Sequence, residues 1–335
     1  MSSASSAAAA APWADLLPEL CGLVVDRLDP VSILRFPAAC RGWAAACEES
    51  PRLRSGAPAL LTSGLDPEGI EVVDAGSFRL HDVSAGGRSF LGEAAGLKGR
   101  TWIGGKDDWL VTTDYACNVE LLNPVTGDRV PLPSFGTTQG AKLELPGYLH
   151  VSTGDRWHKI LKITLCQTPA HPGGGYLAIA LFSDGLLAFT AAGTKKCWTA
   201  LKNHAAASRL DLSYMDAMVL KGKLFAVELL RARHVAARAR RRQRRVTVLG
   251  GDRALFLGAN YPFYITAPPG SEDLKANCVY VADTPSGYDA GIFDLKKTKG
   301  EDGFVERLAC SLMADALRMP MWFRPTTHPR LVKDI

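Results

Sequence analysis

Short apolar runs separated by glycine, asparagine, aspartate or proline fill this chain from about residue 57 onward, and they constrain its fold most strongly. Turn signals recur roughly every 8 to 12 residues, and no run continues as a long helical period. Many runs are rich in β-branched and aromatic residues, which favour strands. The clearest runs are 71–73, 109–112, 119–122, 159–166, 177–182, 186–189, 224–229, 246–249, 278–282 and 291–295. This pattern predicts an all-β sandwich, barrel or propeller.

A degenerate internal repeat favours the propeller. Residues 114–132 run from an aspartate through an apolar strand and an Asn-Pro turn to a glycine and a second strand. Residues 283–308 follow the same order, and 182–201 repeat the strand, the turn and the closing aromatic residue. The blades of a propeller are such repeated sheets, each of which buries its faces against its neighbours.

A different pattern occupies residues 13–49, where helical spacing replaces alternation. Asp15 is a suitable N-cap, and Pro18 falls in the first turn, where a missing N–H costs little. Apolar residues then recur at steps of three and four, which predicts one face of a helix. These residues are Leu17, Leu20, Val24 and Leu28.

Two further proline signals divide the rest of this segment. Asp29-Pro30 predicts a second helix start, and Pro37 predicts a third. The third apolar stripe consists of Cys40, Trp43, Ala44 and Cys47. A module of roughly 40 residues is marginal as a free-standing fold, so we expect its apolar surface to dock on something.

Residues 13–49 resemble the F-box family. The resemblance rests on an ordered series of motifs: Leu17-Pro18, Leu20 to Leu28, Asp29-Pro30 and Cys40-Arg41-Gly42-Trp43. Ala39 and Ala44 depart mildly from the family pattern. The family implies docking on a Skp-type adaptor and, through it, on a cullin ubiquitin ligase. The expected adaptor-binding residues are Leu16, Leu17, Pro18, Leu20, Val24 and Leu28. The alternative is a helical hairpin that caps the neighbouring domain.

The body of the chain resembles the plant domain of unknown function 295, a KIB-type β-propeller that commonly follows an F-box. The resemblance covers about 60 to 330 and rests on phrases in a fixed order. They are DWLVTTD (108–114), LLNPVTGDRVPLP (121–133), CWTAL (197–201), KGKLFAV (221–227), GGDRALFLG (250–258), ANCVYVAD (276–283), GIFDL (291–295) and MWFRPT (321–326). The family implies a kelch-like propeller that presents a protein substrate, and it brings no catalytic residue.

One departure from that family concerns the segment between KGKLFAV and GGDRALFLG. Relatives carry a longer segment there, including a further strand pair, whereas this chain has only 228–249. A propeller lacking part of a blade would expose a sheet edge. We therefore hypothesise that 229–245 is a divergent or mis-spliced insert.

That insert contains eight arginines and no acid between 231 and 245. Without them 31 basic residues face 34 acidic ones, so the rest of the chain is close to neutral. Three interpretations stay open: a nuclear-import or nucleic-acid tract, a solvated helix, and an artefact of the gene model. The residues of the possible tract are Arg238, Arg240, Arg241, Arg242, Arg244 and Arg245. The near-neutral remainder makes nucleic acid an unexpected partner.

Signals for catalysis are weak. Residues 99–107 approach a phosphate-binding loop, but the lysine comes one residue late and Asp107 replaces the Ser or Thr that would hold magnesium. Asp107 and Asp108 are expected to be solvated turn residues. Trp109, Trp198 and Trp322 are expected to pack within blades rather than to stack on a ligand. The seven histidines form no H-x-x-x-H or H-E pair, and the eight cysteines contain no C-x-x-C. No metal, cofactor or disulfide framework is therefore expected.

The fold class predicted is α plus all-β: a short three-helix F-box followed by a kelch-like β-propeller, for which the short segment at 228–249 predicts the loss of part of a blade. The expected organisation is a disordered Ser/Ala tail at 1–11, an F-box-like module at 12–50 and a propeller at 57–330. The predicted function is that of a non-enzymatic substrate receptor of a Skp–cullin–F-box ubiquitin ligase in the nucleus, the cytoplasm or both. The alternative is a propeller scaffold outside any ligase, and an enzyme comes third. No run approaches 18 apolar residues, so no membrane span is expected.

Overall fold

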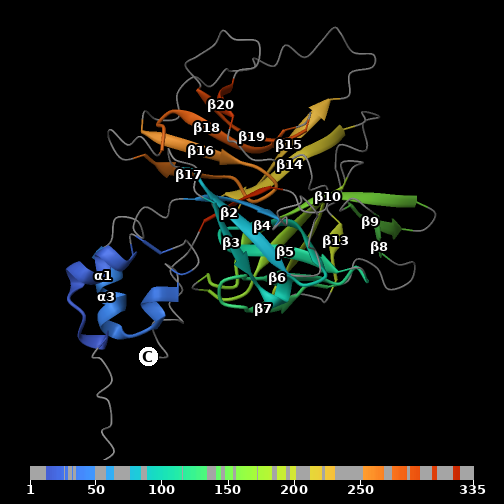
Figure 1. Cartoon of the computed structure of the whole chain (residues 1–335). Helices are drawn as coiled ribbons and strands as arrows, with labels where there is room; N and C mark the ends of the chain where they lie inside the picture. Colours follow the sequence, from blue (N-terminus) through green and yellow to red (C-terminus); the bar gives the residue numbers. More distant parts are fainter. Residues whose placement is uncertain are drawn as a thin grey trace, which may run out of the picture. The chain divides into compact units, whose positions relative to one another are not determined.

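The computed structural model describes a helical N-terminal segment and a long series of strands (Figure 1). Two units divide the chain: one comprises residues 1–57 and 325–335, and the other comprises 58–324. The described residues are 13–25, 27–28, 32, 35–49, 58–63, 76–83, 89–114, 116–133, 141–144, 148–153, 156–171, 173–182, 187–193, 197–200, 212–220, 223–230, 252–267, 274–284, 287–294, 304–307 and 320–324. The predicted tail at 1–11 lies outside them.

Short helices make up the described part of the first unit. They are η1 (Trp13–Asp15), α1 (Pro18–Val25), η2 (Phe36–Ala38) and α3 (Arg41–Glu49). The predicted N-cap was wrong: Asp15 ends η1, and Pro18 is the first residue of α1. The carbonyl of Leu17 accepts the first bonds of α1, from the N–H groups of residues 20 and 21. Pro18 suits this position because its missing N–H would have no partner inside the helix.

The helix that Asp29-Pro30 predicts falls mostly outside the described residues. Ser32 and Arg35 are described, and both are helical. The third predicted start is confirmed, since Pro37 lies in η2 and α3 follows within four residues. A complete three-helix module is therefore not established, although its first and last helices are present.

The first sheet of the second unit joins the two ends of that unit. Its order is β21-β1-β2-β3, with β1 (Ala59–Ser63), β2 (Ser77–Asp82), β3 (Ser89–Glu93) and β21 (Met321–Phe323). Strands β1 and β21 are antiparallel, and Leu60 lies opposite Trp322. The last described strand thus completes the sheet that the first strand begins.

The second sheet consists of two antiparallel meanders and a hairpin. The first meander contains β4 (Arg100–Lys106), β5 (Trp109–Asp114), β6 (Val119–Leu122) and β7 (Arg129–Pro131), and the short helix η4 (Ala95–Leu97) precedes it. The second contains β10 (Arg156–Gln167), β11 (Leu177–Phe182), β12 (Leu187–Ala191) and β13 (Thr199–Ala200). Strands β8 (Ala141–Glu144) and β9 (Tyr148–Thr153) pair with each other, and β9 extends onto β10.

The two meanders meet at their first strands, β4 and β10, which run parallel. Gly104 lies opposite Ile163 at this junction. A Cβ at Gly104 would lie 2.0 Å from the carbonyl oxygen of Ile163, and the φ of Gly104 is +151°. Only glycine allows so close an approach of two backbones.

The remaining strands form a hairpin and a five-stranded sheet. The hairpin is β14 (Leu212–Leu220) with β15 (Lys223–Leu230). The sheet has the order β17-β16-β18-β19-β20, with β16 (Arg253–Leu257), β17 (Phe263–Thr266), β18 (Cys278–Thr284), β19 (Gly287–Asp294) and β20 (Phe304–Arg307). Strands β16 and β18 again pair in parallel.

This unit is mostly sheet and β-propeller-like. Successive antiparallel meanders adjoin through parallel pairs of strands, and the terminal strands share one sheet. The expected runs within the described residues lie in strands, while 71–73 and 246–249 fall outside. So does the insert at 231–245, and β15 pairs only with β14 among the described strands. The hypothesis of an incomplete blade therefore stays a prediction.

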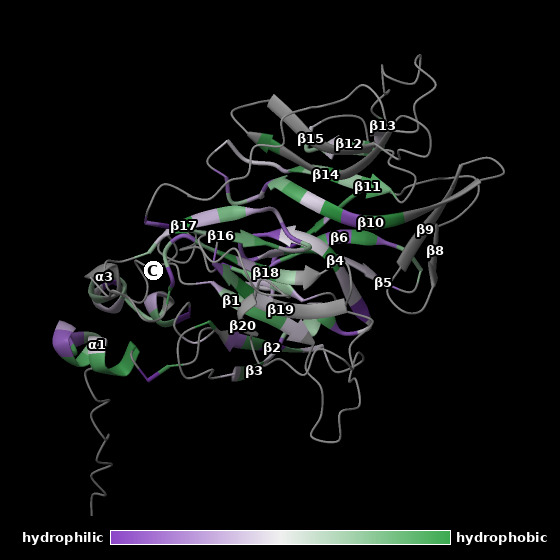
Figure 2. Ribbon diagram, turned by 90° about the horizontal axis from the view of Figure 1, so that it is seen from above, coloured by the Kyte–Doolittle hydropathy of each residue, from purple (hydrophilic) through white to green (hydrophobic). Residues whose placement is uncertain are grey.

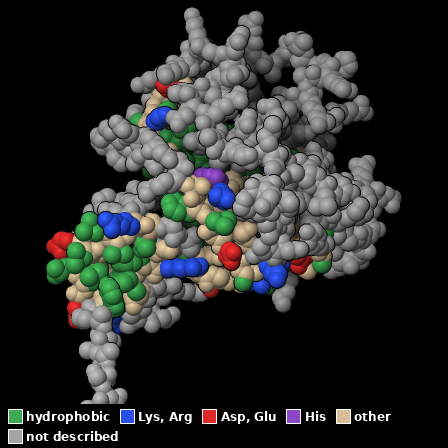
Figure 3. Space-filling view, in the orientation of Figure 1, with side chains coloured by type: hydrophobic (Ala, Val, Ile, Leu, Met, Phe, Trp, Pro, Cys, Tyr) green, Lys and Arg blue, Asp and Glu red, His purple; other side chains and the backbone are tan. Residues whose placement is uncertain are grey.

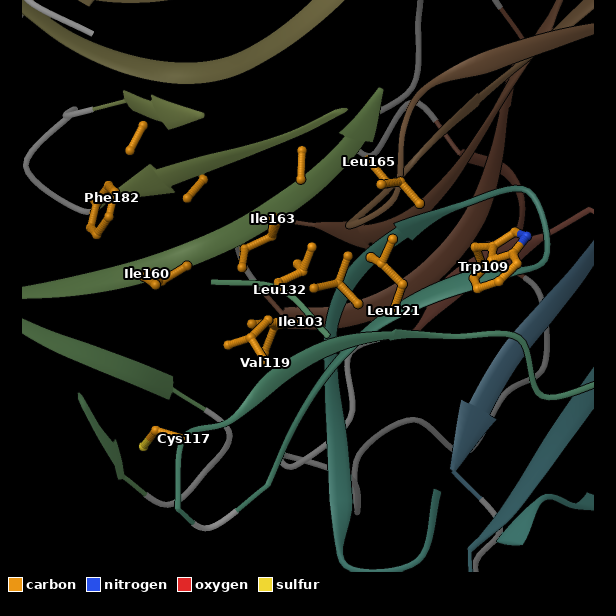
Figure 4. Close-up of a cluster of buried hydrophobic side chains, with 14 residues drawn as sticks. Ile103, Trp109, Cys117, Val119, Leu121, Leu132, Ile160, Ile163, Leu165 and Phe182 are labelled. Carbon is orange, nitrogen blue, oxygen red and sulfur yellow. The ribbon is translucent and has the colours of Figure 1, made fainter. Parts of the chain in front are cut away.

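Two of the apolar clusters among the described residues each join several strands. In the first, side chains of β4–β6 and of the segment that follows β7 meet those of β10–β12, as Figure 4 shows for Ile103, Val119 and Leu121 near Ile163. Figure 2 shows the hydrophobic stretches of β10 and β11 that supply this cluster. The second cluster joins β1 and β21 to β16, β18 and β19 around the aromatic residues Phe256, Tyr280 and Trp322.

The three tryptophans pack as predicted. Trp109 and Trp322 are buried in the two clusters, and Trp198 packs against the first while its indole donates to the carbonyl of Pro133 at 2.8 Å.

A buried arginine cross-links the first meander. Arg100 is 6% exposed, and its guanidinium donates to the Thr112 hydroxyl at 2.9 Å and to the Asn118 carbonyl at 2.7 Å. It also pairs with the carboxylates of Asp114 at 3.2 Å and Glu120 at 3.1 Å. Burial lowers the pKa of Arg100, and the two carboxylates oppose that effect. One side chain thereby holds β4, β5 and β6 together.

Candidate protein-interaction surfaces

The helical unit has its own small core. Cys21, Val25 and Phe36 are buried, and partly buried apolar residues pack around them, namely Leu16, Leu28, Trp43 and Ala46. The rings of Phe36 and Trp43 stack with centroids 4.2 Å apart. The Trp43 indole donates to the carbonyl of Trp13 at 2.8 Å, which ties α3 to the segment before α1.

A second apolar face of the same segment points to solvent. Large side chains there are 38% to 65% exposed: Trp13, Leu17, Leu20, Leu23 and Val24. Leu17, Leu20 and Val24 follow spacings of three and four, which place them along one side of α1 and the residue before it, and Trp13 precedes them in η1. In Figure 3, hydrophobic side chains gather on the surface of the helical unit. A helix that is apolar on both faces is typical of one that is covered on both.

The structure divides the expected adaptor-binding residues into two groups. Leu17, Pro18, Leu20 and Val24 lie on the exposed side, whereas Leu16 and Leu28 pack into the core of the unit. Sequence reasoning missed Trp13 and Leu23. Trp13 lies in η1, outside the periodic pattern of α1. Leu23 follows Leu20 by three residues, a spacing that places it on the same side of the helix.

The other candidate sites considered from the sequence are a phosphate-binding loop, a metal site and the arginine tract. The segment that resembles a phosphate-binding loop is strand β4 with the turn into β5. No group of three or more metal-ligating side chains occurs within the described residues. No helix of the described part is long and apolar enough to cross a membrane. The arginine tract at 238–245 lies outside the described residues.

The expectation that Asp107 and Asp108 are solvated was wrong. Asp108 is fully buried, and the side chain of Asp107 is 11% exposed and paired with Arg324. Burial raises the pKa of Asp107, while Arg324 and Lys106 act in the opposite direction. The φ of Asp107 is +55°, which aspartate tolerates better than most residues in a tight turn. Asp107 therefore helps to join the β4–β5 turn to the segment after β21, because Arg324 follows β21 directly and pairs with Asp107.

One comparison with known proteins gives a match in this part of the chain. Residues 78–237 match the family model described as the KIB1-4 beta-propeller. The match covers just under half of the chain and lies within the second unit. No curated protein matches the chain, and neither does any solved structure. The sheet topology and this match together support a KIB-type propeller.

Proposed function

We propose that this chain is a substrate-receptor subunit of a Skp–cullin–F-box ubiquitin ligase. Its helical unit binds a Skp-type adaptor, and through the adaptor a cullin, while the propeller-like unit holds a target protein. The chain performs no chemistry of its own in this role. It acts in the nucleus, the cytoplasm or both, and neither nucleic acid nor a membrane is required as a partner.

The observation that carries the proposal is the exposed apolar surface formed by Trp13 in η1, by Leu17 before α1 and by Leu20, Leu23 and Val24 within α1. Trp13 and Leu17 are 65% and 62% exposed, which is unusual for side chains of this size unless a partner covers them. The face adjoins the Leu17-Pro18 opening on which the F-box resemblance rests. The KIB1-4 propeller family often occurs in F-box proteins, which supports the same assignment.

A double substitution on this face tests the adaptor. Burying a leucine in an interface contributes about 1.5 to 3 kcal/mol, so Leu17→Ala with Leu20→Ala should cost about 3 kcal/mol of binding or more. That loss corresponds to a roughly 100-fold larger dissociation constant for a recombinant Skp-type adaptor. Isothermal titration or co-purification from a co-expression system measures it.

Leu91→Ala is the matched control, because Leu91 is an equally exposed leucine, 59%, on strand β3 of the other unit. It should leave adaptor binding unchanged. Circular dichroism should show the same helix content in all variants, since neither Leu17 nor Leu20 belongs to the buried cluster. Undiminished adaptor binding by the double variant would reject this surface.

The second candidate is a propeller scaffold that never enters a ligase. Its support is that the family match lies wholly within the second unit. In that case α1 would cover another part of a complex, and the unmodified chain would bind no Skp-type adaptor. The same titration with the unmodified chain therefore separates the two functions.

A further inference from the structure

The tip of the β4–β5 hairpin is held by two segments that are distant in sequence. The carbonyl of Gly105 accepts the N–H of Tyr261 at 2.9 Å, and the carbonyl of Asp107 accepts the N–H of Arg324 at 3.1 Å. The Asp107 carboxylate also pairs with the Arg324 guanidinium. Lys106 lies between these two anchored residues, so its backbone position is fixed on both sides.

The Lys106 side chain ends above an aromatic ring. Its ammonium nitrogen lies 3.7 Å from the centroid of the Tyr261 ring. The Tyr261 hydroxyl donates to the carbonyl of Val219 on β14 at 2.6 Å, which fixes the ring plane. The Arg324 guanidinium lies in the same way 5.1 Å from the ring centroid of Phe263. Two cations over two aromatic rings therefore adjoin one turn.

The N–H donors of the Lys106 ammonium are not used by any hydrogen bond within the described residues. An ammonium group carries three N–H donors and no acceptor. Within the described part of the chain, the ammonium lies over the Tyr261 ring and makes no hydrogen bond or ion pair, although the Asp107 carboxylate nearby favours its charge. A half-buried charge without an acceptor oxygen is costly to keep, and an incoming anion would offset that cost.

Neighbouring charges act on Lys106 in both directions. Burial lowers the pKa of Lys106, the Asp107 carboxylate and the Cys166 thiol act against that effect, and Arg324 adds to it. Asp107 is already engaged by Arg324. The charge of Asp108 contributes to the raised pKa of Asp107.

We propose that Lys106, held over Tyr261, is a recognition point for a carboxylate side chain in an acidic segment of the target protein. The ammonium would donate to the carboxylate, and Tyr261 would present the ammonium in a fixed direction. Such charge-assisted bonds are the strongest that a lysine makes. This inference names the target class for the receptor role proposed above and rests on that role.

The test is a titration of the full chain whose lysines have been dimethylated with ¹³C-formaldehyde, which keeps their positive charge. The Lys106 methyl signal is assigned by its loss in Lys106→Arg. Lys98 is the matched control, because it is an exposed lysine just before the same strand. The probes are an acetylated, amidated peptide with two central glutamates, its glutamine counterpart and inorganic phosphate, all at constant ionic strength.

The glutamate peptide should shift the Lys106 signal in a saturable way, about tenfold more tightly than the glutamine peptide. The Lys98 signal should not saturate. Tyr261→Phe should keep most of the affinity, because the ring remains although its hydrogen bond to the Val219 carbonyl is lost. Tyr261→Leu should reduce the affinity severalfold while the other lysine signals stay in place.

Equal shifts at Lys98 and Lys106 would show unspecific screening and overturn the proposal. Saturation by inorganic phosphate without saturation by the glutamate peptide would overturn the carboxylate assignment. The titration does not involve the adaptor, and the adaptor assay does not involve Lys106. Failure of one is therefore distinguishable from failure of the other.

Discussion

Two buried tryptophans of the propeller-like unit differ in whether the indole N–H is satisfied. The Trp322 indole donates to the carbonyl of Leu257 at 2.9 Å, and Trp322 is 0% exposed. Trp109 is 4% exposed, yet the structure gives its indole nitrogen no hydrogen-bond partner among the described residues. Replacing each tryptophan with phenylalanine removes the same atoms, but only the Trp322 substitution removes a hydrogen bond.

Trp322→Phe should destabilise the unit by about 2 to 4 kcal/mol. The smaller ring leaves a cavity that costs about 1 kcal/mol or more. The Leu257 carbonyl loses its donor, which adds about 1 to 3 kcal/mol. Trp109→Phe should cost only about 0 to 1 kcal/mol, because loss of an unsatisfied donor offsets the cavity.

Urea unfolding of the full chain, followed by far-ultraviolet circular dichroism, measures both variants under the same conditions. The unfolding midpoint should fall clearly further for Trp322→Phe than for Trp109→Phe. Equal midpoints, or a lower one for Trp109→Phe, would refute the reasoning that the indole bond to Leu257 separates the two sites.

Three further predictions concern stability. Burial, aided by Arg79, lowers the pKa of His81 to about 4, below its ordinary value of 6.5. The folded state thus favours the neutral ring, so this stability is present above pH 6.5 and is lost as the pH falls toward 4. The free energy of unfolding, from urea titrations, should fall between pH 7 and pH 5 by about 1 kcal/mol more in the unmodified chain than in His81→Gln. Arg100→Met should lower the free energy of unfolding in urea by about 2 to 4 kcal/mol, because it leaves the carboxylates of Asp114 and Glu120 without their buried partner. Arg129→Met is the control: the Arg129 side chain is 50% exposed, so its loss should cost less than about 1 kcal/mol. Gly104→Ala should abolish cooperative thermal unfolding or lower its midpoint strongly, since the new Cβ meets backbone atoms of β10; a midpoint unchanged from that of the unmodified chain would contradict the close approach.

The strand-rich body could be predicted from local sequence. The runs at 109–112, 119–122, 177–182 and 278–282 each lie in a strand. Such short apolar runs between turn residues have few alternatives to a strand. The helix α1 was equally predictable from its spacing, although its start was not, because Asp15 and Pro18 are both acceptable start signals.

The candidate surfaces were only partly predictable. Leu16 and Leu28 carry the same apolar signal as Leu17 and Leu20, yet the first pair faces Phe36 and Trp43 while the second faces solvent. A helix that is apolar all round has no sequence pattern that tells its inner face from its outer one. Packing of α3 and η2 against one side of α1 makes the choice.

The sequence by itself thus determined that short strands follow a helical segment, because periodicity and turn residues act over a few neighbouring positions. Only the tertiary structure decided what those elements bring together. Arg324 reaches Asp107, Tyr261 lies under Lys106, and Trp322 places the last strand beside the first. Each of these pairs joins positions far apart in the chain, and no local pattern encodes such a contact. The contact of Lys106 with Tyr261 and the pairing of β21 with β1 exist because segments distant in the sequence lie side by side.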